Sequence, residues 1–273
     1  MAESNQSAVK EREKKSEGVS HEERLMIAGQ IKDMIVEKYG EQAKMIALCG
    51  STVRGEDTQF SDMEMMVILK GQQKAKDVSF LYGENYMHVE MLSEDDLMKK
   101  IGQVNLNWPF VVGTFHNIKI LAGDSSMIDE VKKAAEALPE EKFASAIQEG
   151  VLSLFENVGK IKAAKLKGRN ELANLDTLIY RLALKVGLIV SLMNRAPIFG
   201  SSYKAFDSLY GLPKLPENFE KDAKLIIASE NPDEKTRYAL DLFESFLKFA
   251  KEQGVEIESY SSAQELKMLA ENF

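Results

Sequence analysis

The chain has 273 residues, 44% of them hydrophobic and 29% charged, and its formal net charge at pH 7 is -8. This composition is typical of a globular protein and excludes disordered, collagen-like and coiled-coil classes, while the length favours two modest domains over one. The acidic balance argues against general nucleic-acid binding, which needs a phosphate-neutralising surface. The single cysteine, Cys49, excludes an intrachain disulfide, and no CxxC pair or His/Cys cluster offers a zinc site.

No membrane or export segment is visible in the sequence. Spanning a bilayer needs about 18–20 consecutive apolar residues, and no run approaches that length. The opening stretch MAESNQSAVKEREKKSEG also lacks the apolar core of a secretory signal. We therefore expect a cytoplasmic protein without a membrane partner. Residues 1–20 are expected to form a mobile tail, because ordering them would bury little apolar surface.

The first half of the chain alternates between helix and strand signals. Ser20 is the expected N-cap of a helix that runs to about Tyr39, and Gly40 is its left-handed stop. A second capping box, from Ser93 to Asp96, predicts the start of another helix. Four short apolar or alternating runs, bounded by turn residues, predict strands. These runs are Met45–Cys49, Met63–Leu69, Tyr86–Leu92 and Thr114–Leu121.

The strand signals end at about Glu140, and long amphipathic segments follow. The proline in Leu138-Pro139 disfavours helix at the residue before it and marks the break. Asn231 and Pro232 supply an N-cap and a first-turn proline for the last long helix. We expect helices over residues 142–167, 172–194, 203–210 and 233–253.

Segregation of strands and helices along the chain predicts an α+β protein with separate domains. The expected organisation is a tail over 1–20, a mixed-sheet domain over 21–139 and a helical domain over 140–273.

Two acidic residues introduce the second predicted strand. In Ser61-Asp62-Met63-Glu64, strand geometry places Asp62 and Glu64 on one face, while Met63 points to the other. Two such carboxylates repel each other unless a cation neutralises them, and Mg²⁺ or Mn²⁺ prefers oxygen ligands. Glu90 on the next strand is a candidate third ligand, and three acids can hold two metals for phosphoryl displacement.

A candidate phosphate-binding turn lies just upstream. Gly50 and Ser51 end the first strand and Arg54 follows within one turn, where backbone N–H groups, a hydroxyl and a guanidinium can meet phosphate oxygens. Taken singly, a Gly-Ser turn and an exposed acidic pair are common structural features. Their combination in this order favours a functional site.

These residues resemble a known motif. Gly50-Ser51, Arg54 and Ser61-Asp62-Met63-Glu64 are similar to the glycine-serine and paired-carboxylate motif of the DNA polymerase β-like nucleotidyltransferase superfamily, and the following Met-Met is similar to the kanamycin nucleotidyltransferase (aminoglycoside nucleotidyltransferase) family. The resemblance extends from about His21 to Glu258. Further counterparts are Tyr39-Gly40, Val89-Glu90, Asn107-Trp108-Pro109 with Gly113, and Leu154-Phe155-Glu156 with Gly159-Lys160.

The resemblance implies a nucleotidyltransferase domain followed by a helical bundle, in a homodimer. The implied reaction transfers a nucleoside monophosphate from ATP or another NTP to a hydroxyl of a small, aminoglycoside-like molecule and releases pyrophosphate. The implied metal ligands are Asp62, Glu64 and Glu90, the first two also counting as catalytic.

The resemblance also implies the other roles at the site. Gly50, Ser51 and Arg54 would hold the triphosphate, Lys160 would touch phosphate, and Glu156 would be the general base. The spacing of four residues puts Glu156 and Lys160 on one helix face, which equally fits a surface ion pair worth about 0.2–0.5 kcal/mol.

The acceptor stays open at this stage. The aminoglycoside enzymes that this chain resembles have further acidic residues just before the general base. This chain has Leu152 and Ser153 at those positions, with Glu149 one turn earlier. Modification of a protein or RNA end is an alternative, although the acidic composition disfavours RNA. A non-catalytic nucleotide-binding module is a third possibility.

Overall fold

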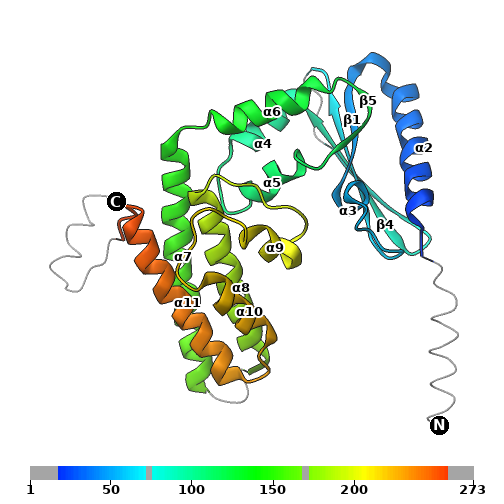
Figure 1. Ribbon diagram of the computed structural model, residues 1–273. Coiled ribbons are helices and arrows are strands. Elements are labelled where there is room, and N and C mark those ends of the chain that lie inside the picture. The colour runs from blue at the N-terminus through cyan, green and yellow to red at the C-terminus, as the bar shows by residue number, and fades with distance from the viewer. Residues whose placement is uncertain (1–17, 72–75, 168–171, 258–273) are drawn as a thin grey trace, which may run out of the picture. The chain divides into compact units, whose positions relative to one another are not determined.

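The computed structural model describes residues 18–71, 76–167 and 172–257 (Figure 1). Most of the predicted tail therefore lies outside the described residues. The chain divides into two compact units. The first holds the described residues up to Val104, with Trp108–Leu138 and Pro197–Lys204; the second holds Asn105–Asn107, Pro139–Ala196 and the described residues from Ala205 onward. Within the described part of the chain, no helix combines the length and apolar character needed to cross a membrane.

The first unit is built on a five-stranded mixed sheet with the order β3-β4-β2-β1-β5. β2 runs parallel to β4, whereas β1 is antiparallel to both β2 and β5, and β3 is antiparallel to β4. The strands are β1 (Ala43–Cys49), β2 (Met63–Leu69), β3 (Lys76–Tyr82), β4 (Asn85–Ser93) and β5 (Lys119–Gly123).

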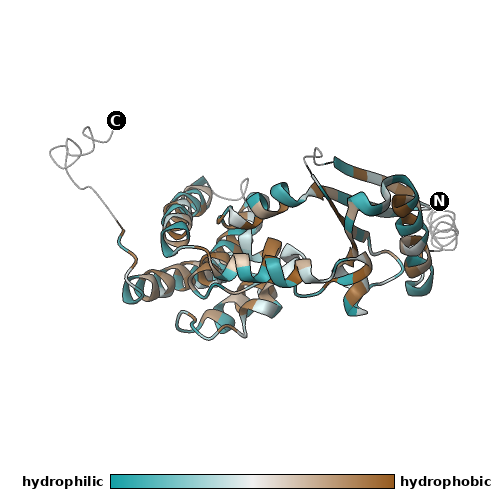
Figure 2. Ribbon diagram, turned by 90° about the horizontal axis from the view of Figure 1, so that it is seen from above, coloured by the Kyte–Doolittle hydropathy of each residue, from teal (hydrophilic) through white to brown (hydrophobic). Residues whose placement is uncertain are grey.

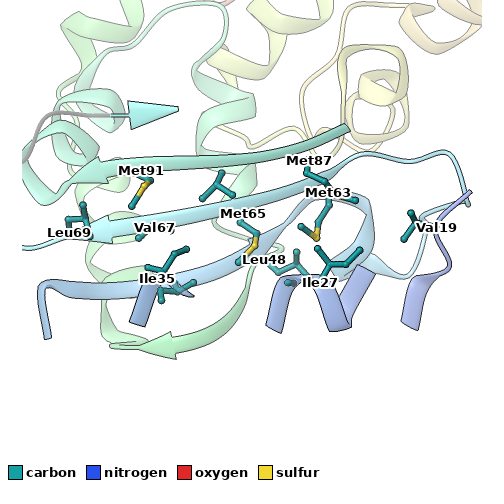
Figure 3. Close-up of a cluster of buried hydrophobic side chains, with 13 residues drawn as sticks. Val19, Ile27, Ile35, Leu48, Met63, Met65, Val67, Leu69, Met87 and Met91 are labelled. Atoms are coloured by element: carbon teal, nitrogen blue, oxygen red, sulfur yellow. The ribbon is translucent and has the colours of Figure 1, made fainter. Parts of the chain in front are cut away.

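Helix α2 (His21–Tyr39) packs on one face of this sheet. Its N-terminus is capped as predicted, because the Ser20 hydroxyl accepts a hydrogen bond from the Glu23 backbone N–H at 3.1 Å. Figure 3 shows side chains of α2 against alternate residues of the strands, which form one buried cluster. The cluster includes Ile27, Ile35, Leu48, Met63, Met65, Val67, Met87 and Met91.

The remaining helices of the first unit are short. α4 (Glu94–Gly102) starts at the predicted N-cap Ser93, whose hydroxyl accepts from the Asp96 N–H at 3.1 Å, and α4 contacts β2 and β4. The others are η1 (Gly40–Gln42), α3 (Gly50–Arg54), α5 (Trp108–Thr114), α6 (Ser126–Glu136) and η3 (Ser202–Lys204).

The second unit is helical. α7 contacts α8, and α11 contacts both α8 and α10. Hydrophilic and hydrophobic residues are interspersed along these helices (Figure 2), as the amphipathic pattern predicts. Asn231 caps α11, accepting from the Asp233 N–H at 2.9 Å. The helices are α7 (Glu140–Lys167), α8 (Leu172–Met193), α9 (Ala205–Leu209), α10 (Phe219–Ala228) and α11 (Pro232–Glu252).

The predicted α+β class and mixed sheet are confirmed, and one strand prediction needs correction. The expected strand Thr114–Leu121 is wrong in its first half, because Thr114 ends α5 and β5 begins only at Lys119. Backbone N–H groups of Phe115 and His116 instead donate to Val112 and Gly113, which keeps this stretch in a turn. Strand β3 and helices α5, α6 and α10 were not predicted.

Candidate active site

Helix α3 follows β1 directly and begins with a glycine that its position requires. Gly50 has φ +75°, in the left-handed region, and a Cβ added there would lie 2.8 Å from Glu64 Oε2. Only glycine therefore permits this backbone shape and this approach of the Glu64 carboxylate. The predicted Gly50-Ser51 turn and the predicted acidic strand thus meet in the first unit.

Strand register places the two strand-borne acids on one face. Glu64 in β2 lies opposite Cys49 in β1 and His88 in β4, and Glu90 follows two residues after His88. Because side chains alternate along strands, Glu64 and Glu90 share the face opposite the α2 cluster that holds Met63 and Met65. The sheet thus brings two predicted metal ligands onto neighbouring strands.

The electrostatics of Glu64 link it to the other predicted site residues. Burial of the carboxylate raises the pKa of Glu64, and the negative charge of Asp62 raises it further. His88 and Arg54 oppose this shift, while Glu90 adds to it. The acids therefore share one electrostatic neighbourhood that positive charge would stabilise.

The described residues do not gather the three acids into a ready metal cluster. Among them, no group of three or more His, Cys, Asp or Glu side chains is arranged to hold a metal ion. Glu90 is instead engaged by Lys100, whose Nζ donates to Glu90 Oε1 at 2.5 Å. The neighbouring Cys49 thiol has its pKa raised to about 12 by burial, with Glu64 and Glu90 contributing, which makes it a poor nucleophile.

Arg54 ends α3 and pairs with a carboxylate that Lys204 also contacts. Its Nε donates to Glu56 Oε2 at 3.0 Å, and Lys204 Nζ approaches the same oxygen at 3.5 Å. The hydrogen bond from Arg54 is the largest contribution that lowers the pKa of Glu56. The guanidinium predicted to bind phosphate thus already holds a carboxylate of its own chain.

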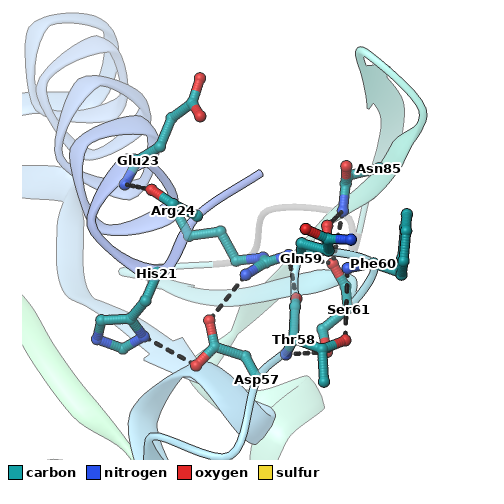
Figure 4. Close-up of polar contacts among 10 residues, drawn as sticks. His21, Glu23, Arg24, Asp57, Thr58, Gln59, Phe60, Ser61 and Asn85 are labelled. Atoms are coloured by element: carbon teal, nitrogen blue, oxygen red, sulfur yellow. Dashed lines mark hydrogen bonds and ion pairs between the residues drawn. The ribbon is translucent and has the colours of Figure 1, made fainter. Parts of the chain in front are cut away.

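A buried arginine that the motif did not reveal holds the loop leading to Asp62 (Figure 4). The Arg24 side chain is 0% exposed and donates to Asp57 Oδ2 at 2.8 Å, to the Thr58 carbonyl at 2.7 Å and to the Ser61 carbonyl at 3.0 Å. His21 Nδ1 lies 2.8 Å from the other Asp57 oxygen. The sequence signal for this role was the position of Arg24, which lies three residues before Ile27 and therefore on the helix face assigned to the core.

A second element fastens the same loop. The buried Asn85 side chain in β4 donates to the carbonyls of Gln59 at 2.8 Å and Ser61 at 3.1 Å. The Val19 N–H also donates to the Gln59 carbonyl, at 3.0 Å. The backbone just before Asp62 is therefore fixed from α2, from β4 and from the residues preceding α2.

The predicted general base lies in the second unit, on α7. Lys160 Nζ donates to Glu156 Oε1 at 2.5 Å, with side chains 55% and 62% exposed respectively. This hydrogen bond lowers the pKa of Glu156. Nearby on α8, Lys185 donates to Asn157 Oδ1 at 3.0 Å, and its positive charge also lowers the pKa of Glu156. The predicted site residues thus belong to two units: Glu156 and Lys160 belong to the second, and the others belong to the first.

Comparison with known proteins matches both units. Residues 125–256 match the family described as KNTase C-terminal domain. Two proteins named aminoglycoside nucleotidyltransferase (4'), from Bacillus sp. and Staphylococcus aureus, are each 26% identical over 227 residues, covering 82% of this chain and 88% of the relative. A solved nucleotidyltransferase-like protein from Exiguobacterium sibiricum aligns with a TM-score of 0.48 at 16% identity, covering 89% of this chain and 86% of its own.

The two curated relatives span the phosphate-binding turn, the acidic strand and most of the helical unit together. The resemblance inferred from Gly50-Ser51 and Asp62-Met63-Glu64 is therefore confirmed, and the chain is an enzyme of the kanamycin nucleotidyltransferase-like kind.

Proposed function

We propose that this chain transfers a nucleoside monophosphate from ATP or another NTP to a hydroxyl of an aminoglycoside and releases pyrophosphate. The observation that carries the proposal is the Glu64 carboxylate held against Gly50, within the electrostatic reach of both Asp62 and Arg54. Acidic groups for a cation and a basic group for phosphate then lie in one place. The acceptor class comes from the names of the two relatives, both aminoglycoside nucleotidyltransferases.

The acids of the first unit suit a hard divalent cation. Asp62 and Glu64 offer carboxylate oxygens, and the repulsion that raises the pKa of Glu64 would be relieved by positive charge. Asp62 and Glu64 would hold Mg²⁺ or Mn²⁺, and Glu90 is a third ligand for which Lys100 competes. When bound, the cation supplies charge neutralisation at the phosphates.

The transfer forms one P–O bond and breaks another. The acceptor oxygen attacks the α-phosphorus, the bond from that phosphorus to the oxygen bridging to the β-phosphate breaks, and pyrophosphate leaves with the bonding electrons. The hydroxyl proton passes to the Glu156 carboxylate, which Lys160 keeps ionised by lowering its pKa. Ser51 and Arg54 bind the triphosphate, and Lys160 contacts phosphate.

The positions before the base shape the acceptor preference. Leu152 is exposed, and the Ser153 hydroxyl donates to the Gly150 carbonyl at 2.7 Å, so neither residue adds negative charge beside Glu156. Glu149 is exposed one turn earlier and is the remaining acid in this part of α7. We expect acceptors with few amino groups to compete well with more highly charged ones.

The test is pyrophosphate release from ATP or GTP in the presence of Mg²⁺ and a panel of acceptors. The panel contains aminoglycosides with different numbers of amino groups, neutral polyols, RNA and a carrier protein. Asp62→Asn should abolish transfer, and Glu156→Gln should lower kcat by roughly 10²–10⁴-fold with little change in nucleotide affinity. Wild-type turnover in either variant would remove the assigned role.

Two exposed acids provide matched controls for these substitutions. Asp33→Asn in α2 and Glu244→Gln in α11 remove the same charge from residues without an assigned role. Both controls should retain full transfer. Transfer to RNA or protein but to no aminoglycoside would replace the proposed acceptor, and the absence of transfer to every acceptor would overturn the proposal.

The proposal also includes a homodimer working in the cytoplasm. The reduced state expected of the lone, buried Cys49 agrees with that compartment. Light scattering should give twice the chain mass of 30.6 kDa. A mass of 30.6 kDa at assay concentrations would exclude the dimer.

A further inference from the structure

The segment Pro197–Lys204 belongs to the first unit, although the helices that flank it belong to the second. Ile198 is buried, and its N–H donates to the Pro109 carbonyl at 2.9 Å. A Cβ added to Gly113 would lie only 1.9 Å from the Ile198 carbonyl oxygen, so the segment packs directly on the backbone of α5. These contacts hold the segment firmly in one place on the first unit.

This anchoring brings the end of the segment to Arg54. A Cβ added to Gly200 would lie 3.6 Å from Arg54 Nη2, so the Gly200 backbone packs beside the guanidinium. Four residues later, Lys204 Nζ lies 3.5 Å from Glu56 Oε2, the oxygen that Arg54 Nε contacts at 3.0 Å. One carboxylate oxygen is therefore shared by two cationic side chains from distant parts of the sequence.

The exposure of these groups leaves room for a ligand. The side chains of Lys204 and Glu56 are 37% and 47% exposed, whereas Arg54 is 17% exposed. Two cationic side chains share one monovalent carboxylate here, so Glu56 alone does not neutralise both of them. A phosphate oxygen accepts the same hydrogen bonds as a carboxylate oxygen and carries more charge with it, so it competes well for such a pair.

We propose that Lys204 joins Arg54 in binding the triphosphate and that Glu56 occupies this phosphate position when no nucleotide is bound. The proposal rests on the function proposed above. It adds a nucleotide-binding residue, Lys204, from the segment between α8 and α9, and it makes the Glu56 carboxylate a competitor of the triphosphate. The Glu56 side chain moves away from the two cations when a phosphate takes its place.

The alternative is a surface ion pair that only fastens the segment, and such pairs contribute about 0–1 kcal/mol to stability. The two interpretations predict different effects on nucleotide binding when Glu56 is removed. If Glu56 competes with phosphate, its removal tightens nucleotide binding. If the ion pair only holds the segment in place, removing Glu56 loosens the segment beside Arg54 and leaves nucleotide binding unchanged or weaker.

The experiment is equilibrium titration of the full chain with ATP and, separately, with inorganic tripolyphosphate, both with Mg²⁺. Lys204→Met should weaken binding of both ligands by roughly three- to tenfold, the effect of losing one charge-assisted contact. Glu56→Gln should tighten both by roughly two- to fivefold. The tryptophan fluorescence of Trp108, which is buried in the first unit, verifies that each variant is folded.

A second ion pair of the first unit provides the control. Lys44 Nζ lies 3.2 Å from Glu94 Oε2, and Lys44 is at the start of β1 while the site is at its end. Lys44→Met and Glu94→Gln make the same charge changes and should leave both affinities unchanged. Equal effects at the two pairs would show a long-range charge effect and would overturn the proposal.

Each remaining outcome also decides the question. Unchanged binding in Lys204→Met, or unchanged or weaker binding in Glu56→Gln, overturns the proposal while the nucleotidyltransferase function stands. An effect on ATP without one on tripolyphosphate would exclude a phosphate contact. If the wild-type chain binds neither ligand, the proposed function itself fails.

Discussion

Replacing Arg24 by methionine tests whether the buried ion pair holds the first unit together. The Arg24 and Asp57 side chains are 0% and 2% exposed, so the substitution leaves a carboxylate buried without its main counter-charge. Removing one member of such a pair typically costs about 3–5 kcal/mol. The Thr58 and Ser61 carbonyls also lose their donor, so we expect a loss at the upper end of that range.

The assay is urea unfolding followed by tryptophan fluorescence. The chain has one tryptophan, Trp108, which is 3% exposed and lies in the first unit, so its signal reports the unfolding of that unit. A control is Lys99→Met, which removes an exposed ion pair to Asp96 at 3.6 Å and should cost less than about 1 kcal/mol.

A double substitution separates the ion pair from other effects of the same change. Combining Arg24→Met with Asp57→Asn removes both charges, and its cost should be well below the sum of the two single costs. The reasoning would be refuted if Arg24→Met cost no more than the Lys99 control, or if the two single costs were simply additive.

Two further predictions concern the same region. Burial raises the pKa of the Asp57 carboxyl, but the hydrogen bonds from His21 and Arg24 outweigh it and hold the pKa below 3.8. As the pH falls, the Asp57 carboxylate is therefore protonated in the unfolded chain before it is protonated in the folded one, so the free energy of unfolding should fall below about pH 4. Asp57→Asn should reduce this dependence of the free energy of unfolding on pH. An unchanged pH dependence would contradict the assignment. Gly50→Ala should cost about 1–2 kcal/mol from its positive φ, displace Glu64 and lower the transfer rate; full activity in this variant would show that the close approach is unimportant.

Features specified by neighbouring residues were predicted well. The caps at Ser20, Ser93 and Asn231 depend on side chains that bond to the backbone two or three positions later, and all three are present. The strand β3 escaped prediction because it is an edge strand with both faces largely exposed, so it lacks apolar alternation. The two-residue turn at Gly83, with φ +60°, was its remaining signal.

In the candidate site too, the features set by local sequence were predicted, and those set by the packing of distant segments were not. The positions of Glu64 and Glu90 on adjacent strands follow from the period of strands, and the structure has them there. The engagement of Glu90 by Lys100 and the contact of Lys204 with Glu56 depend on how distant segments pack. Motif and period carry no information about such contacts, and the roles of these residues stay predictions.

The return of Pro197–Lys204 to the first unit affects the order in which the protein matures during synthesis. Residues up to Leu138 leave the ribosome well before Ile198 is made, so the surface around Gly113 waits for a partner through the synthesis of α7 and α8. A chain truncated at Leu138 would keep the sheet but expose that surface permanently. The two units are therefore interleaved along the polypeptide, and dividing the gene at one position does not give a complete copy of either unit.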